Sequence, residues 1–311
     1  MSYKIILLFI LILSILLFVS SCMLTGLSSS SSLSPAETTI NKENSESISD
    51  KETTTNSTAA STTAAEDDET STSATNTYVQ DVLPDENTVL DYLIEKKEIY
   101  EKDEEKFIEI IANYPYFIHE ESAEVFDSAN LIIYDEYVNF EILDFKDIAE
   151  QTAEFGKDNY SSPFVLEINY SLEYADNYFV SVLFYYFSFT GGAHPNNETF
   201  AFNYDITNRK QVLLNDLFAI GYDYLTFLSE YCFDDIKRQY LEMGVDFANV
   251  EDWVEEGTDT EDPVNFDNFN LSEEGMIITF NPYDVGPYVM GPFKVIIPFD
   301  KFNGNIIYPV K

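Results

Sequence analysis

The sequence from residue 78 to residue 311 predicts an α+β fold, because it contains two different hydrophobic periodicities in separate segments. Two segments, 123–155 and 225–240, place apolar residues at steps of three and four, which is typical of one buried helix face. Other segments alternate apolar and polar residues with a period of two, which is typical of strands. With 234 residues, this part of the chain is long enough for one large or two small domains.

The alternating pattern predicts strands at 107–116, 164–174, 199–204, 275–280 and 293–299, and we also assign 89–101 to a strand. The segment 178–189 is almost unbroken apolar and aromatic sequence, as expected for a central strand covered on both faces. A short turn at Asp176 and Asn177 joins it to 164–174 in a hairpin. Pro298 indicates that the last strand lies at an edge or ends there.

Two helices are predicted from the steps of three and four. The expected buried face of the first, at 123–155, consists of Phe126, Ala129, Ile133, Tyr137, Phe140 and Leu143 or Asp144. The second is expected to bury Leu225, Leu228, Cys232, Ile236 and Tyr240. We therefore interpret Cys232 as a core residue and not as a reactive thiol, since free cysteine is among the most buried residue types.

The stretch 250–267, which contains EDWVEEGTDTEDP, is interpreted as a solvated acidic loop. A calcium site is the alternative, because carboxylates are suitable calcium ligands. The spacing does not match the calcium-loop pattern that ends in glutamate at its twelfth position, so the solvated loop is preferred.

The charge of the chain excludes one class of partner. There are 16 Lys and Arg residues against 56 Asp and Glu residues, which gives a formal net charge of -40. From residue 78 onward the net charge is still about -34, so most of the excess of acidic residues lies in the part of the chain that is predicted to fold. We expect no nucleic-acid partner, because binding a polyphosphate requires a basic surface.

The first 22 residues have the organisation of a secretory signal. Lys4 is followed by an apolar run at 5–19 and then by Ser20, Ser21 and Cys22. The run is short for a membrane span, which needs roughly 20 residues. The sequence VSSC resembles the lipobox of bacterial lipoproteins, which implies removal of residues 1–21 and acylation of Cys22, for example by palmitate. An uncleaved anchor or an ordinary secretory signal is the alternative.

The next segment, 22–77, is predicted to be a disordered tether. Serine, threonine, alanine, asparagine and glutamate dominate it, and it contains no aromatic residue. Such a segment buries too little apolar surface to offset the entropy of ordering it. We expect the folded part to lie outside the cytoplasm, in the periplasm or on the outer surface, held at the membrane by the lipid.

Catalytic and metal-binding signatures are scarce. The chain has two Cys and two His residues, and we find no serine-hydrolase, zinc-protease or phosphate-loop motif. The stretch Phe233-Asp234-Asp235 resembles the FDD motif of carbohydrate deacetylases, but no H-x-x-x-H pair accompanies it. We therefore expect no catalytic residue, no metal site and no cofactor.

Two motifs resemble a known family. The first is SVLFYYFSFTGGAHPNN at 181–197, and the second is ITFNPYDVGPYVMGPFKVIIPF at 278–299, with LNDLF at 214–218 between them. Together they resemble the paired extracytoplasmic domains of the RsiV and PdaC-like family, over roughly 98–299. The resemblance implies helices packed on a largely antiparallel sheet in two small subdomains, PdaC-like at 78–200 and RsiV-like at 201–311.

The family also suggests a role in the bacterial envelope. Some members bind lysozyme as anti-sigma factors, and others carry a peptidoglycan deacetylase domain after this module. In this chain we expect neither a cytoplasmic sigma-binding part nor a following catalytic domain.

The two motifs contain the candidate binding residues. Gly191 and Gly192 permit a positive φ directly after a strand, and the following proline stiffens the exit, so that His194 is presented in a fixed conformation. Tyr283 and Tyr288 lie in a proline- and glycine-rich loop, and tyrosines on such loops make contacts at a low entropic cost. A structural turn at His194, and packing of the tyrosines over the sheet edge, remain the alternatives.

We therefore expect a lipid-anchored, non-catalytic binding module of the cell envelope. A basic, lysozyme-type hydrolase would be attracted by the negative charge, with an on-rate that falls as salt rises. A peptidoglycan glycan is the other expected ligand, because tyrosines and Trp253 offer stacking faces. The alternative is a carbohydrate-active hydrolase or a deacetylase-accessory protein.

Overall fold

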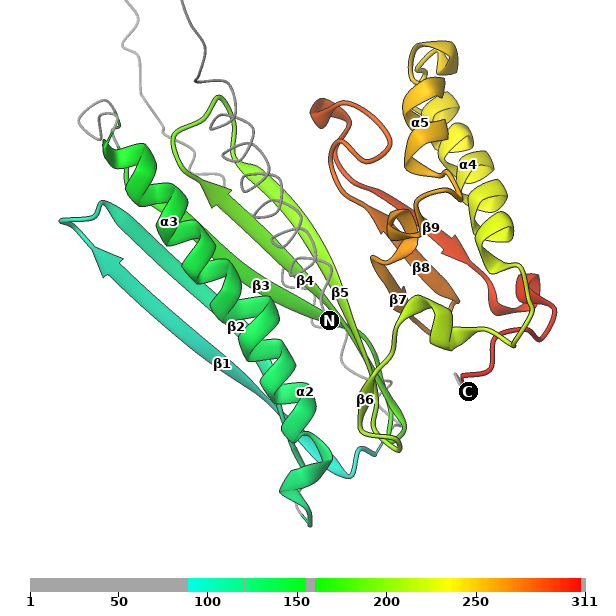
Figure 1. Ribbon diagram of the computed structural model, residues 1–311, viewed down its shortest axis with the longest axis horizontal. Coiled ribbons are helices and arrows are strands. Elements are labelled where there is room, and N and C mark those ends of the chain that lie inside the picture. Colours follow the sequence, from blue (N-terminus) through cyan, green and yellow to red (C-terminus); the bar gives the residue numbers. More distant parts are fainter. Residues whose placement is uncertain (1–88, 120, 155–159, 161, 309–311) are drawn as a thin grey trace, which may run out of the picture. The chain divides into compact units, whose positions relative to one another are not determined.

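A computed structural model describes residues 89–119, 121–154, 160 and 162–308. These residues form a six-stranded sheet and a three-stranded sheet, with helices against each (Figure 1). The predicted α+β fold class is confirmed. The predicted signal segment 1–21, the lipidation site Cys22 and the tether 22–77 lie outside the described residues.

The larger sheet has its strands in chain order, β1 to β6. Its strands are β1 (Tyr92–Asp103), β2 (Ile108–His119), β3 (Phe164–Ala175), β4 (Phe179–Phe189), β5 (Asn196–Asp205) and β6 (Lys210–Gln211). Every neighbouring pair is antiparallel except β2 and β3, which are parallel. A parallel pair needs a crossover, and the helical segment between β2 and β3 supplies it. The expected largely antiparallel sheet and the predicted strands are confirmed.

The crossover covers one face of the larger sheet (Figure 1) and consists of α2 (Asp127–Ile132), a π-helical stretch (Ile133–Asn139) and α3 (Phe140–Glu154). The predicted buried face is correct through Tyr137, which packs against Phe184 and Phe202, and wrong beyond it. The residues buried after that point are Val138, Ile142, Phe145 and Ala149. Phe140 and Leu143 are instead 42% and 58% exposed. A π-helical turn closes over five residues and not four, so it moves the buried face one position along the chain.

The predicted hairpin of β3 and β4 is confirmed, with Asp176 at its turn. The Asp176 carboxylate accepts hydrogen bonds from the backbone N–H groups of Tyr178 and Phe179, both at 2.7 Å. Strand β4 is central, and residues 179–184 are buried without interruption. Its alternate side chains face the crossover helices on one side and the smaller sheet on the other, as expected for a strand covered on both faces.

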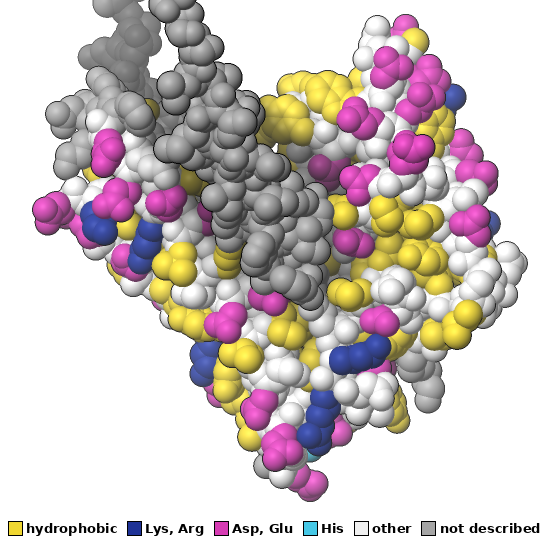
Figure 2. Space-filling view, in the orientation of Figure 1, with side chains coloured by type: hydrophobic (Ala, Val, Ile, Leu, Met, Phe, Trp, Pro, Cys, Tyr) yellow, Lys and Arg dark blue, Asp and Glu magenta, His cyan; other side chains and the backbone are white. Residues whose placement is uncertain are grey.

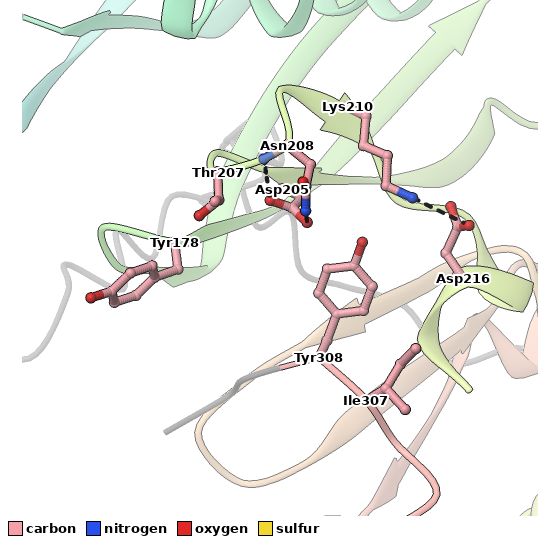
Figure 3. Close-up of a pocket in the computed structure, with 8 residues that line it drawn as sticks. All are labelled: Tyr178, Asp205, Thr207, Asn208, Lys210, Asp216, Ile307 and Tyr308. Carbon is pink, nitrogen blue, oxygen red and sulfur yellow. Dashed lines mark hydrogen bonds and ion pairs between the residues drawn. The ribbon is translucent and has the colours of Figure 1, made fainter. Parts of the chain in front are cut away.

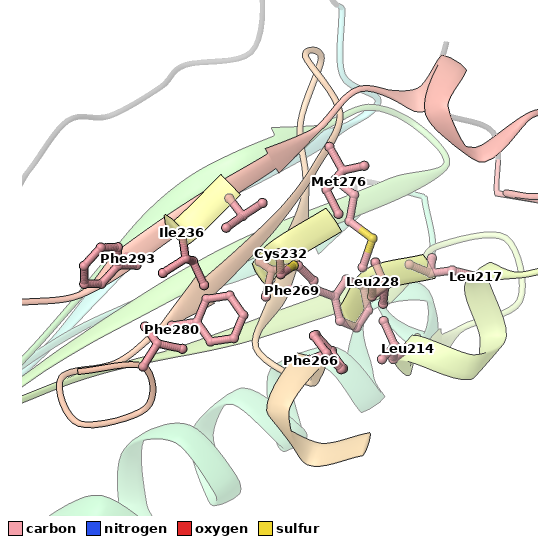
Figure 4. Packing of buried hydrophobic residues seen from close by; sticks show 14 of the residues in the cluster. Leu214, Leu217, Leu228, Cys232, Ile236, Phe266, Phe269, Met276, Phe280 and Phe293 are labelled. Carbon is pink, nitrogen blue, oxygen red and sulfur yellow. The ribbon is translucent and has the colours of Figure 1, made fainter. Parts of the chain in front are cut away.

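The smaller sheet contains β7 (Phe269–Leu271), β8 (Met276–Phe280) and β9 (Phe293–Ile297), all antiparallel. The sheet packs against α4 (Tyr224–Glu242), and Figure 4 shows the resulting core around Cys232, Ile236 and Phe280. Cys232 is completely buried, as predicted. Strand β9 is at an edge and ends immediately before Pro298, also as predicted.

The interpretation of 250–267 as a loop is wrong in part. Residues Glu251–Gly257 form the short helix α5, and Pro263–Phe266 form a 3-10 helix. Val254 and Phe266 are fully buried, because they pack into the core around α4. The short strand β7 was not predicted from the alternating pattern.

Buried polar side chains connect the two sheets. Asn270 on β7 donates to the Ser181 hydroxyl on β4 at 2.9 Å and to the Val182 carbonyl at 3.0 Å. The Ser181 hydroxyl also accepts from the backbone N–H of Leu271 at 3.1 Å and donates to Asn203 at 2.7 Å. These groups are shielded from water, so each depends on the others for its hydrogen bonds.

The subdomain division between residues 200 and 201 stays a prediction; position 200 lies within β5. None of the helices among the described residues is long and apolar enough to cross a membrane.

Candidate functional site

The two motifs singled out in the sequence meet in space. The loop after β4 carries Gly191, Gly192 and His194, and the loop between β8 and β9 carries Tyr283 and Tyr288. The rings of His194 and Tyr288 are stacked, with centroids 3.9 Å apart and planes inclined by 20°. The Tyr283 hydroxyl lies 3.3 Å from Nε2 of His194. All three candidate rings therefore belong to one cluster.

The hydrogen bonds of this cluster indicate which nitrogen of the neutral His194 imidazole carries the proton. Nδ1 of His194 lies 2.9 Å from the Pro195 carbonyl oxygen, which can only accept, so Nδ1 carries the proton. In the neutral ring Nε2 is then the acceptor, and the Tyr283 hydroxyl donates to it. Tyr288 donates to the Pro195 carbonyl at 2.8 Å and accepts from Asn197 at 2.9 Å. The rings are thus oriented by contacts within the site.

The two glycines of the first motif have different roles. Gly191 has a φ of +90°, and a Cβ there would come within 2.3 Å of the Tyr160 ring. Both observations explain why glycine stands at this position. A Cβ on Gly192 would meet only the His194 carbonyl oxygen, at 3.6 Å, which is an ordinary contact.

The backbone of Tyr283 is strained. Its φ is +80°, a region that residues with side chains rarely adopt. The indole N–H of Trp253, on α5, donates to the Tyr283 carbonyl at 3.0 Å and helps to hold this conformation. The Tyr283 side chain is 49% exposed, so its ring is available to a ligand.

Asn281 fixes the second loop to the larger sheet. Its side-chain oxygen accepts from both the backbone N–H and the hydroxyl of Thr199 on β5, at 2.7 and 2.9 Å. Its backbone N–H donates to the Asp284 carboxylate at 2.6 Å. Burial raises the pKa of Asp284 to about 6, with a smaller contribution from Glu198, and the hydrogen bond from Asn281 opposes the rise.

A groove of about 1130 Å³ lies beside this cluster. Its floor is formed by three adjacent strands, on the face of the larger sheet that is turned away from α2 and α3. The floor residues are Glu167, Asn169, Ser171 and Glu173 on β3, Tyr185 and Phe187 on β4, and Asn197 and Thr199 on β5. Its wall is formed by Thr279, by the loop that contains Asn281 and Tyr288, and by Lys294. Tyr288 therefore belongs both to the ring cluster and to the groove.

A second pocket, of about 660 Å³, lies near the end of β5 (Figure 3). Asp205 is 5% exposed there and accepts two hydrogen bonds from Asn208, both at 2.8 Å. Lys210 and Asp216 pair with each other at 3.4 Å. Because these polar groups satisfy one another, we interpret this pocket as a structural junction.

Within the described ranges, no group of three or more His, Cys, Asp and Glu side chains is arranged to hold a metal ion. Burial raises the pKa of the Cys232 thiol, and the nearby Asp235 raises it further, so this thiol is a poor nucleophile.

Comparison with known proteins gives a family match for a segment in each half of the fold. Residues 101–197 match the family model described as Deacetylase PdaC, and residues 215–300 match a protein family of unknown function, DUF3298. The folded part is similar to PdaC and DUF3298 domains. This supports the resemblance inferred from the motifs at 181–197 and 278–299.

Two curated relatives and one solved structure are similar to this chain. Peptidoglycan-N-acetylmuramic acid deacetylase PdaC of Bacillus subtilis is 24% identical over 185 residues, which is 60% of this chain and 36% of the relative. Immunogenic protein MPT64 of Mycobacterium tuberculosis is 29% identical over 108 residues, or 35% of this chain and 43% of the relative. The chain thus matches less than half the length of either.

The solved structure is a member of the DUF3298 family from Bacteroides fragilis. It has a TM-score of 0.54 and 18% identity, and the match covers 71% of this chain and 96% of that one. At this identity the likeness concerns the fold alone.

The sequence singled out the three rings, within two separate motifs, but missed both their contact and the groove. The roles of His194, Gly191, Gly192, Tyr283 and Tyr288 in binding stay a prediction. The alternating pattern at 164–174 already placed the polar side chains of β3 on one wet face. It carried no sign that aromatic residues of β4 lie in the same face, because nearly every residue of that strand is apolar.

Proposed function

We propose that the chain is a lipid-anchored, extracytoplasmic binding module of the bacterial envelope, and that it acts by docking without making or breaking bonds. Its similarity to PdaC, whose name refers to peptidoglycan, supports a cell-wall-related role. The observation that carries the proposal is the stacking of His194 on Tyr288 at the groove, which joins both motifs in one preformed surface.

A wall glycan is the ligand that this surface fits best. The groove combines the aromatic side chains Tyr185, Phe187 and Tyr288 with amides and carboxylates. Aromatic faces can stack on sugar rings, and a few placed polar groups fix orientation in a largely preformed site. Trp253 and Tyr283, at 38% and 49% exposure, extend the aromatic surface beyond the groove.

A basic, lysozyme-type hydrolase is the second candidate ligand. Acidic side chains gather over α4 and α5, as the space-filling view shows (Figure 2). They include Asp234, Asp235, Glu251, Asp252 and Glu255. Such a surface speeds the association of a basic protein at low salt, and the effect fades as salt rises.

A pull-down at two salt concentrations tests the proposal. The full chain is incubated with purified peptidoglycan sacculi and, separately, with c-type lysozyme. Capture of sacculi supports the glycan, whereas capture of lysozyme that is lost at high salt supports the hydrolase. Failure to retain either would contradict a binding role.

The anchor is tested separately. Growth with labelled palmitate should mark the wild-type chain but not a Cys22→Ser variant. An unlabelled wild-type chain would contradict lipid anchoring while leaving the binding role intact.

A further inference from the structure

The floor of the groove is a regular grid of side chains. On β3 and β4, Glu167 lies opposite Phe187 and Asn169 lies opposite Tyr185. On β4 and β5, Tyr185 in turn lies opposite Thr199. The alternation of strand side chains puts all these groups on the face away from α2 and α3. The floor therefore presents carboxylate, amide and aromatic groups side by side.

Several polar groups of the floor and wall are unpaired. Among the described residues, no hydrogen bond or ion pair involves the Glu167 carboxylate, and Asn169 uses only its side-chain oxygen, which accepts from Asn113 at 3.0 Å. On the wall, Thr279 is 2% exposed and its hydroxyl has no partner. A buried hydroxyl such as that of Thr279 is costly unless a ligand or water satisfies it, and the partly buried Glu167 and Asn169 groups are available to a ligand.

The lining of the groove is negatively charged. Glu167 and Glu173 contribute carboxylates on the floor, and Lys294 contributes the one ammonium group among its described lining residues. The Glu173 carboxylate is held in place by the Ser171 hydroxyl at 2.6 Å, and that hydroxyl lies 3.1 Å from the Tyr185 hydroxyl. The acceptors are thus positioned next to aromatic rings.

The two carboxylates on β3 are far enough apart to favour an extended ligand. Glu173 is six positions after Glu167, which corresponds to roughly 20 Å along a strand. A single sugar cannot contact both, whereas an oligosaccharide lying along the strand can.

From this arrangement we propose that the groove binds an amino-sugar oligosaccharide that carries free, protonated amino groups. The sugar faces pack on Tyr185, Phe187 and Tyr288, and the ammonium groups donate to Glu167 and Glu173. A charge-assisted hydrogen bond is stronger than a neutral one, so a free amine is preferred over the acetylated form. This inference rests on the proposed function and specifies its ligand.

The same charges disfavour other ligands. A glycan rich in carboxylates would meet the two like charges of Glu167 and Glu173 and one opposite charge in the groove. A fully acetylated, neutral glycan can stack on the rings but leaves the two carboxylates without a cationic partner. The preference therefore concerns the acetylation state of the glycan.

Calorimetric titration of the full chain in detergent tests the preference. The probes are the β-1,4-linked tetramer of glucosamine, the same tetramer fully N-acetylated, and glucosamine monomer. We expect the glucosamine tetramer to bind at least about tenfold more tightly than its acetylated form, because hydrogen bonds to charged groups are worth about 1.5–3 kcal/mol. The monomer should bind more weakly than the glucosamine tetramer.

A matched pair of variants locates the effect. Glu167→Gln removes one charge from the groove floor, and Glu150→Gln removes one from the exposed side of α3, which covers the opposite face of the larger sheet. We expect Glu167→Gln to weaken binding of the glucosamine tetramer about tenfold while changing binding of the acetylated tetramer less than twofold. Glu150→Gln should leave both within twofold of the wild type.

Equal or tighter binding of the acetylated tetramer overturns the inference, and so does an equal loss in both variants, which would indicate a general charge effect. If neither tetramer binds but sacculi or lysozyme are still captured, the inference fails and the proposed function stands. If nothing is captured, both fail.

Discussion

Ser181 on β4 and Asn270 on β7 are hydrogen-bonded at 2.9 Å in the interior, although 89 residues separate them in the chain. Through this pair the smaller sheet is fixed to the centre of the larger one. Ser181→Ala removes a donor to Asn203 and an acceptor for Leu271, all shielded from water. We expect a loss of about 1–3 kcal/mol in the free energy of unfolding, because buried polar groups are left unpaired.

Urea denaturation of the Ser181→Ala and Asn270→Ala variants and of the double variant measures the loss in the free energy of unfolding. The two losses should be non-additive by at least about 0.5 kcal/mol, since the residues share one network. The exposed Ser162→Ala is the control and should stay within about 0.5 kcal/mol of the wild type. Strict additivity would contradict the proposed coupling between the sheets.

The two glycines of the GGAHP motif provide a second test. Gly191→Ala places a Cβ against Tyr160 and forces alanine to a φ of +90°. A non-glycine residue in such a region costs about 1–3 kcal/mol, and we expect the free energy of unfolding to fall by that amount. Gly192→Ala lacks both problems and should lower stability by less than about 0.5 kcal/mol. Similar losses from the two substitutions would show that the turn is more tolerant than its geometry indicates.

The thiol of Cys232 should be inert in the folded protein. The side chain is fully buried, and burial raises its pKa, so little thiolate forms at pH 8. In a Cys22→Ser variant, Cys232 is the only thiol, and a chromogenic disulfide reagent should react with it only after denaturant is added. Rapid modification of the native variant would contradict the core assignment.

The pH dependence of stability should include a contribution from Asp284. Its pKa in the folded protein is raised to about 6 from an ordinary value of 3.8. Between these values the folded chain binds a proton that the unfolded chain does not, so this group stabilises the fold as pH falls from about 7 to about 4. Part of the side chain contacts water, which keeps the effect modest.

Asp284→Asn removes this titration and can still accept from the Asn281 backbone through its amide oxygen. Urea midpoints at pH 7.5 and pH 5 should therefore differ less in the variant than in the wild type. An unchanged difference would show that other carboxylates account for all of the pH dependence.

The spacing of apolar residues along the sequence was sufficient to predict most of the strands and helices, because each kind of element buries its side chains at a characteristic interval. The buried face after Tyr137 was misassigned since a π-helical turn changes the spacing without a visible mark in the sequence. The acidic residues around Val254 suggested a loop, but the buried side chains of Val254 and Phe266 hold the segment against the core.

The candidate rings could be chosen from the sequence, but their contact could not be predicted. His194 and Tyr288 attracted notice separately, through the glycine and proline residues beside them. Their stacking depends on how the smaller sheet lies on β5, which is decided by Thr199, Asn281 and the other buried polar pairs. Contacts between side chains so distant in the chain leave no trace in local periodicity.

The described lining of the groove comes from a floor and a single wall. A polymer can therefore be laid into it sideways, without threading a free end. In a cross-linked polysaccharide network, chain ends are few. An open groove of this kind can bind any internal stretch of a glycan strand. The number of binding positions would therefore increase with strand length and not with the number of strand ends.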